Sequence, residues 1–135
     1  MTDPTDEAAL EDFDISHKEV FVALGRFDAP SPPSDVAAKV TELLRFLEEF
    51  TSNHFAREQA AMASFGYPRT AAHKAAHETI RGKVRVARAE FTAHGPTAAV
   101  GDALREAVGY LLHDQMAAHD RALLEFVKER KAGKR

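Results

Sequence analysis

The sequence predicts an all-α protein with one domain, an up-down-up-down four-helix bundle. Apolar side chains recur at spacings of three and four residues in four stretches, the pattern of amphipathic helices. Breakers that contain proline or glycine separate the stretches, and no segment carries a strand signal. A chain of 135 residues suits one domain with one core. Because the connections are short, neighbouring helices are expected to run antiparallel.

The first predicted helix spans about residues 14–27 and follows an acidic N-terminal arm, residues 1–12. Asp14 and Ser16 are both suitable N-caps, and Glu19 completes a capping box with Ser16. The three prolines of segment 28–33 end this helix, because proline cannot continue one.

The other three predicted helices also lie between a cap and a breaker. They span about residues 34–65, 70–94 and 97–128. Ser34, Thr70 and Thr97 serve as their N-caps, and Gly66 and Gly95 stop the second and third helices. The charged residues 129–135 form the C-terminal tail.

Composition excludes several classes of function. A net charge of −3 argues against nucleic-acid binding, which needs a basic surface. No apolar stretch is long enough to cross a bilayer, and residues 1–14 are acidic and lack the apolar segment of a secretory signal. We therefore expect a cytoplasmic protein that contacts neither nucleic acid nor membrane. The chain has no cysteine, so any metal it binds must take nitrogen and oxygen ligands.

Two histidine spacings indicate a metal site inside the bundle. His54 and Glu58 are four residues apart on the second helix, and His73 and His77 repeat the spacing on the third, so each pair shares a helix face. One such pair alone is weak evidence, but two on adjacent antiparallel helices indicate converging ligands, with His17 on the first helix as a further candidate. Imidazole suits iron, copper, zinc and nickel, and a carboxylate can bridge two ions.

Segments 13–21, 54–62 and 67–77 resemble the motifs of the first three helices of hemerythrins, bacterial ones in particular. The resemblance implies a non-haem centre of two iron ions joined by an oxo or hydroxo bridge. It implies that His17 and His54 bind one iron, that His73 and His77 bind the other, and that Glu58 bridges the two.

The fourth helix departs from the family pattern, which is Trp-Leu-x-x-His-Ile-x-x-x-Asp. In the matching segment 111–120, Asp120 falls on the bridging aspartate, Leu111 replaces the tryptophan, and Gln115 stands at the fifth histidine ligand. A register with His113 at the histidine is rejected, because it puts Ala118 in place of the aspartate.

His119 is a second candidate for the missing ligand. On an α-helix it lies about 40° around from Gln115, whereas Asp120 lies about 140° around. Two alternatives follow. Either His119 replaces the histidine, with the helix rotated or locally unwound, or Gln115 binds through its amide oxygen or leaves the position to solvent.

In hemerythrins, O2 binds at an open iron position in an apolar pocket, which the resemblance places among Val20, Phe55, Leu111 and Leu112. The implied function is reversible O2 binding, for carriage, delivery or sensing, by a protein that is not an enzyme. One alternative is a di-iron site with altered ligands that reacts with O2 or peroxide as an oxidase or peroxidase. The other is a non-catalytic bundle that binds iron or a partner.

Overall fold

The computed structural model describes residues 4–133, with the side chains of residues 16–130, 132 and 133. The described residues form helices and connecting turns and include no strand. The elements, in order, are α1 (Pro4–Asp28), the 3-10 helix η1 (Pro33–Asp35), α2 (Val36–Phe65), α3 (Thr70–His94), α4 (Ala98–Tyr110), the π-helix η2 (Leu111–Asp120) and α5 (Arg121–Ala132).

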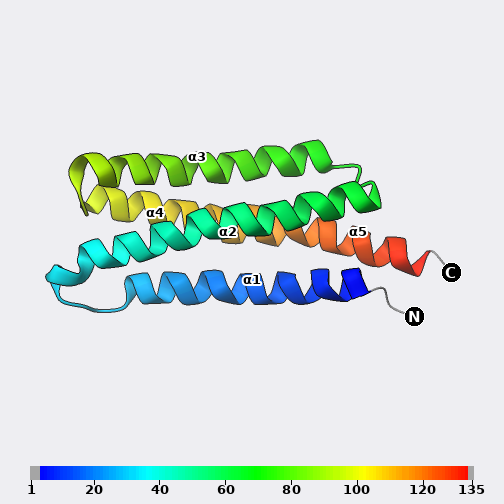
Figure 1. Cartoon of the computed structure of the whole chain (residues 1–135), viewed down its shortest axis with the longest axis horizontal. Helices are drawn as coiled ribbons and strands as arrows, with labels where there is room; N and C mark the ends of the chain where they lie inside the picture. Colours follow the sequence, from blue (N-terminus) through cyan, green and yellow to red (C-terminus); the bar gives the residue numbers. More distant parts are fainter. Residues whose placement is uncertain (1–3, 134–135) are drawn as a thin grey trace.

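The elements α4, η2 and α5 follow one another without a break in the helical backbone and make the fourth rod of a bundle. Figure 1 shows α1, α2, α3 and this rod lying side by side, each antiparallel to the one before it. The predicted all-α, up-down-up-down four-helix bundle is therefore confirmed.

The first helix begins ten residues earlier than the sequence analysis predicted. It starts at Pro4, so most of the expected arm of residues 1–12 is helical, and residues 1–3 lie outside the described chain. Proline fits the first turn of a helix, and the following acidic, alanine and leucine residues favour helix continuation. Neither Asp14 nor Ser16 can then be an N-cap, because both lie inside α1.

Two other predicted caps differ as well. The residue before α2 is Asp35, reached through η1, so Ser34 does not cap this helix, and the residue before α3 is Arg69. Thr70 is instead the first residue of α3, and its hydroxyl donates to the carbonyl of Tyr67 at 2.6 Å. The Thr97 cap is confirmed, because its side chain accepts a hydrogen bond from the backbone N–H of Val100.

The core has two apolar parts with a polar layer between them. The large cluster contains residues of all four rods and reaches Phe55 on α2 and Met116 on the fourth rod. The small cluster lies beyond them and consists of Met62, Tyr67, Leu123 and Val127. Between the two along α2 and the fourth rod come the buried polar residues Glu58 and Asp120. Burial of polar groups at this level calls for partners that satisfy them.

Across residues 4–133, no helix combines the length and apolar character that a membrane span requires.

Candidate metal centre

Four buried side chains bring ligand atoms together in the polar layer. Glu58 comes from α2, His73 and His77 from α3, and Asp120 from the end of η2. One ligand atom of each lies within 4.8 Å of the others, and no side chain of the four is more than slightly exposed. The spacing of four residues on α3 directs both histidines to one face, as the sequence predicted.

Glu58 lies at the centre of the cluster. Its Oε1 atom is 3.0 Å from Nε2 of His77, 3.3 Å from Nε2 of His54 and 3.4 Å from Nε2 of His73. Three imidazoles from two helices thus converge on one carboxylate oxygen. A carboxylate with imidazoles on two sides can hold two ions between its neighbours.

Asp120 makes a matching set of contacts from the opposite rod. Its Oδ1 atom lies 3.0 Å from Nε2 of His73, and its Oδ2 atom lies 3.2 Å from Nε2 of His54. Each oxygen of this carboxylate therefore contacts a different helix. Glu58 and Asp120 together link His54 on α2 with His73 on α3.

The π-helix explains how Gln115 and Asp120 reach the same site. On an α-helix, residues five apart point about 140° away from each other. In a π-helix the hydrogen bonds join residues five apart and the turn is wider, so such residues lie much closer together around the axis than on an α-helix. In η2, Nε2 of Gln115 donates to Oδ1 of Asp120 at 3.0 Å, and both residues are buried. The α-helical geometry used in the sequence analysis is therefore wrong for this segment.

His119, the other candidate ligand of the fourth rod, lies behind His73. Its half-buried ring meets the edge of the His73 ring, with centroids 5.7 Å apart, and it is outside the group of four. Gln115 is fully buried and lies 3.1 Å from Nε2 of His73. His113 is exposed, which agrees with the rejection of the register that would make it a ligand.

His17 is not brought into the group of four. It is half-buried on α1, and its ring lies against Phe21 with centroids 5.1 Å apart. The residue of α1 that contacts the site is Ser16, whose hydroxyl lies 3.1 Å from Nδ1 of His54. Ser16 is buried on α1, whereas the neighbouring His17 is half-buried.

Two residues support the histidines and were not identified from the sequence. Ser16 contacts Nδ1 of His54, and Nε2 of Gln59 lies 3.4 Å from Nδ1 of His77. A histidine that binds metal through Nε2 carries its proton on Nδ1 and needs an acceptor there. The Ser16 hydroxyl can accept directly, and Gln59 can do so once its amide turns to bring Oε1 to Nδ1 in place of Nε2. Their positions in the sequence could have identified them, because each is next to a residue of the motif: Ser16 precedes His17, and Gln59 follows Glu58.

The carboxylates and imidazoles shift one another's pKa values. Burial alone raises the pKa of Glu58, but hydrogen bonds from His54, His73 and His77 outweigh it and bring the pKa well below its usual range. Burial opposes protonation of His73, yet Asp120 and Glu58 together raise its pKa to about 9. Burial lowers the pKa of His77 and raises that of Asp120. The two acidic side chains therefore favour the protonated form of His73, the imidazole that lies between them.

The cluster fits a metal ion on two further observations. Oε1 of Gln115, on a side chain that contacts His73 and Asp120, is buried and has no hydrogen-bond partner among the described residues, and a cation could pair with it. Unsatisfied buried polar atoms of this kind each cost about 1–3 kcal/mol. The donors are imidazole nitrogens and carboxylate oxygens, a combination that iron accepts. A cation would offset the negative charge of the two buried carboxylates. It would also bind the imidazoles, which in its absence share hydrogen bonds with the same carboxylate oxygens.

The four residues predicted to form the O2 pocket, Val20, Phe55, Leu111 and Leu112, are all buried in the large apolar cluster. Phe55 stacks on the ring of His77, with centroids 3.7 Å apart and an angle of 6° between the planes. Phe55 therefore places the edge of the apolar cluster directly against a candidate ligand.

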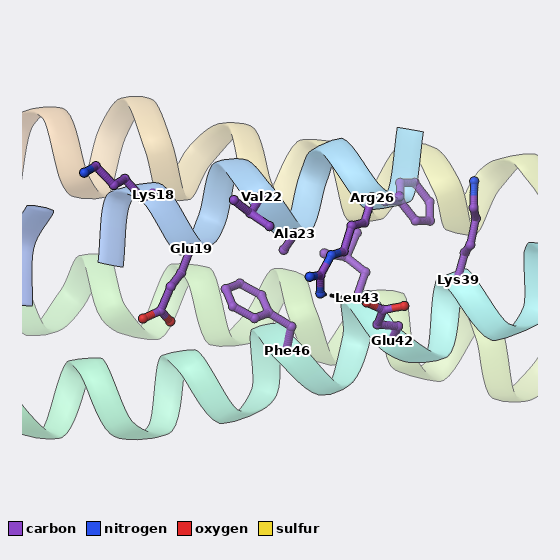
Figure 2. Close-up of a pocket in the computed structure, with 10 residues that line it drawn as sticks. Lys18, Glu19, Val22, Ala23, Arg26, Lys39, Glu42, Leu43 and Phe46 are labelled. Atoms are coloured by element: carbon purple, nitrogen blue, oxygen red, sulfur yellow. Dashed lines mark ion pairs between the residues drawn. The ribbon is translucent and has the colours of Figure 1, made fainter. Parts of the chain in front are cut away.

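A separate hollow of about 340 Å³ lies between α1 and α2 (Figure 2). Arg26 and Glu42 form an ion pair at 3.6 Å from opposite sides of it. Its floor includes Phe27, Leu43 and Phe46, and none of the predicted metal ligands lines it. The hollow is therefore distinct from the metal centre.

Comparison with known proteins agrees with this geometry. The family model described as the hemerythrin HHE cation binding domain matches residues 8–127. A bacteriohemerythrin of Stenotrophomonas maltophilia (strain R551-3) is 29% identical over 119 residues, which cover 88% of this chain and 75% of that protein. A myohemerythrin of Sipunculus nudus is 38% identical over 82 residues, which cover 61% of this chain and 62% of that protein. No solved structure gives a significant match.

Members of the matching family are non-enzymatic proteins that bind iron and typically O2, in agreement with the prediction that the chain is not an enzyme. The family model covers nearly the whole described chain, and the buried histidine and carboxylate cluster lies within the matched residues. The chain therefore belongs to the hemerythrin family of iron-binding proteins.

Proposed function

We propose that this protein binds O2 reversibly at a centre of two iron ions and serves in O2 carriage, delivery or sensing. The observation that carries the proposal is the position of the two carboxylates. Glu58 and Asp120 each contact His54 on α2 and His73 on α3, and both are buried. This is the arrangement expected of two carboxylates that bridge a pair of ions.

In this proposal, the two ions have different protein ligands. His73 and His77 hold one ion, and His54 with His17 holds the other. Glu58 and Asp120 contribute to both. The part of His17 rests on the family motif, because its half-buried ring is outside the group of four. When bound, the iron supplies the electrons that reduce O2 and regains them when O2 leaves.

The protein's own residues would control access to the centre. Val20, Phe55, Leu111 and Leu112 are buried in the apolar cluster that Phe55 joins to His77, and this apolar surrounding would exclude water and so slow oxidation of the iron. Ser16 and Gln59 hold the rings of His54 and His77 through their Nδ1 atoms. These contacts fix the histidines in the orientation that points Nε2 toward the carboxylates.

The test is anaerobic loading with ferrous iron, followed by optical spectra in air and again after O2 is removed. We expect absorption bands from the iron centre to develop in air and to disappear when O2 is withdrawn, over repeated cycles. Bands that persist after O2 is removed, or steady consumption of O2 with a reductant, would instead indicate an oxidase-like reaction. A Leu112→Ala variant should show the same initial bands but a shorter lifetime in air, because a smaller apolar side chain shields the centre less from solvent.

A further inference from the structure

We infer that the amide oxygen of Gln115 is a fifth protein donor to the ion held by His73, His77 and the two carboxylates, in the place of a third imidazole, and that it makes this position more receptive to Mn²⁺ than that imidazole would. The inference rests on the proposed function, in that it requires the cluster to bind metal. Gln115 is a residue at which this chain departs from the hemerythrin motif. With its amide oxygen as a ligand, this ion would have more oxygen donors than the motif provides.

The end of the Gln115 side chain already lies where a ligand would lie. Its terminal Nε2 atom is 3.1 Å from Nε2 of His73 and 3.0 Å from Oδ1 of Asp120. Two ligands at right angles around an ion, each with a bond of about 2.1 Å, are about 3 Å apart. Gln115 is fully buried, so solvent cannot take this place unless the side chain moves away.

The orientation of the amide depends on whether a cation is present. Without metal, the NH2 group faces the Asp120 carboxylate and donates to it, while Oε1 has no partner. A cation at this position repels the NH2 group and attracts the carbonyl oxygen, since only the oxygen has a lone pair to offer. Half a turn about the last side-chain bond exchanges the two atoms, and the rest of the residue stays in place. Metal binding therefore reverses the amide.

The exchange of glutamine for histidine changes the chemistry of the position. The ion would have two imidazoles, two carboxylates and one amide oxygen, in place of three imidazoles and two carboxylates. Imidazole suits zinc, copper, iron and nickel, whereas carboxylate and carbonyl oxygens suit manganese. Zinc still binds more tightly than manganese in absolute terms, because affinity follows the general order of divalent ions. What changes is the ratio of the two affinities.

The ratio can be measured by titration of the metal-free protein with MnCl2 and with ZnCl2. We expect the Gln115→His variant to bind Zn²⁺ at least about tenfold more tightly relative to Mn²⁺ than the parent does, since even a lost outer contact changes metal affinity by about 10–100-fold. Gln115→Leu is the matched control, because it removes the oxygen and keeps a similar volume. It should weaken the binding of both ions.

A second measurement reads the amide directly. The chain has only three side-chain amides, those of Asn53, Gln59 and Gln115, so each NH2 pair is resolved in a ¹⁵N NMR spectrum. Zn²⁺ is diamagnetic and leaves these signals visible. We expect zinc to shift the Gln115 pair, identified by its absence in Gln115→His, as its bond to Asp120 breaks.

The outcomes separate this inference from the proposed function. If the parent, Gln115→His and Gln115→Leu all fail to bind either ion, the metal centre itself is wrong. If the parent binds metal but has the same zinc-to-manganese ratio as Gln115→His, only the role of Gln115 is overturned. An unchanged Gln115 NH2 pair in the zinc-bound parent overturns it as well.

Discussion

Oε1 of Glu58 on α2 lies 3.0 Å from Nε2 of His77 on α3, in the polar layer between the two apolar clusters. The same oxygen is within 3.4 Å of His54 and His73. A single carboxylate therefore connects the ligand pairs of both helices. This connection determines which substitutions should matter most.

Loss of Glu58 should disrupt the metal pair more than loss of Gln115. Glu58→Ala removes the atom that contacts three imidazoles and leaves the cations without one of their two carboxylates. Gln115→Ala removes one neutral donor. We expect Glu58→Ala to lose both irons and Gln115→Ala to keep at least one, measured as iron per chain after anaerobic loading and desalting. Equal retention in the two variants would exclude a bridging role for Glu58.

The supporting contacts at Nδ1 should affect metal affinity without affecting the ligands themselves. Ser16→Ala removes the partner of His54, and Gln59→Leu removes the partner of His77. We expect each change to weaken metal binding by about 10–100-fold, the usual effect of losing an outer hydrogen bond at a metal site. Ser64→Ala, at an exposed position of α2, is the control and should bind like the parent. Parent-like affinity in both test variants would show that the contacts do not position the rings.

The stability of the metal-free protein should depend on the protonation of His73. Its pKa is raised to about 9, from the ordinary value of 6.5, since bonds to Asp120 and Glu58 outweigh the effect of burial. A raised pKa in the folded state stabilises the protein below the unfolded value, and the contribution is lost as pH rises through about 9.

Urea unfolding of the metal-free protein measures this dependence. We expect the free energy of unfolding to carry a His73 contribution that decreases from about pH 6.5 to above about pH 9, and His73→Gln to lack that decrease. The difference between the two curves is the informative quantity, because other groups titrate in both proteins. Parallel curves across this range would show that His73 is not charged in the folded state.

Metal should stabilise the fold, and acid should remove the effect. An ion that binds only the folded state adds about 2.7 kcal/mol when its free concentration is 100 times Kd, a rise in Tm of about 10 °C for a domain of this size. The ligands must be deprotonated to bind, so the rise should shrink toward pH 5 as the imidazoles take up protons. Thermal unfolding of metal-free and iron-loaded protein under nitrogen gives both values. Identical Tm values at neutral pH would contradict a buried metal centre.

The bundle and most of the site followed from local patterns in the sequence. Amphipathic helices repeat apolar residues every three or four positions, so the four rods could be predicted from this spacing. The spacing of His54 with Glu58, and of His73 with His77, gave the shared faces that the structure confirms. The prediction that Asp120 belongs to the site depended on the family motif, because residues five apart on an α-helix point in different directions and Asp120 would not lie beside Gln115.

The remaining differences arise from features that local patterns do not encode. The π-helix depends on how the fourth rod packs, and only it brings Gln115 and Asp120 to one face. A serine such as Ser16 can either cap a helix or contact a buried histidine, and the sequence around it does not distinguish the two roles. Because α1 starts at Pro4, Ser16 lies inside the helix and takes the second role. The contact of Ser16 with His54 likewise depends on how α1 packs against α2, which a motif does not specify.

The number of irons per chain tests the central claim most directly. Protein should be loaded anaerobically with ferrous iron and desalted, and its metal content compared with the protein concentration from amino-acid analysis. The account predicts two irons per chain, and fewer in Glu58→Ala measured alongside. One iron or none in the parent, under conditions in which it remains folded, would contradict a di-iron centre.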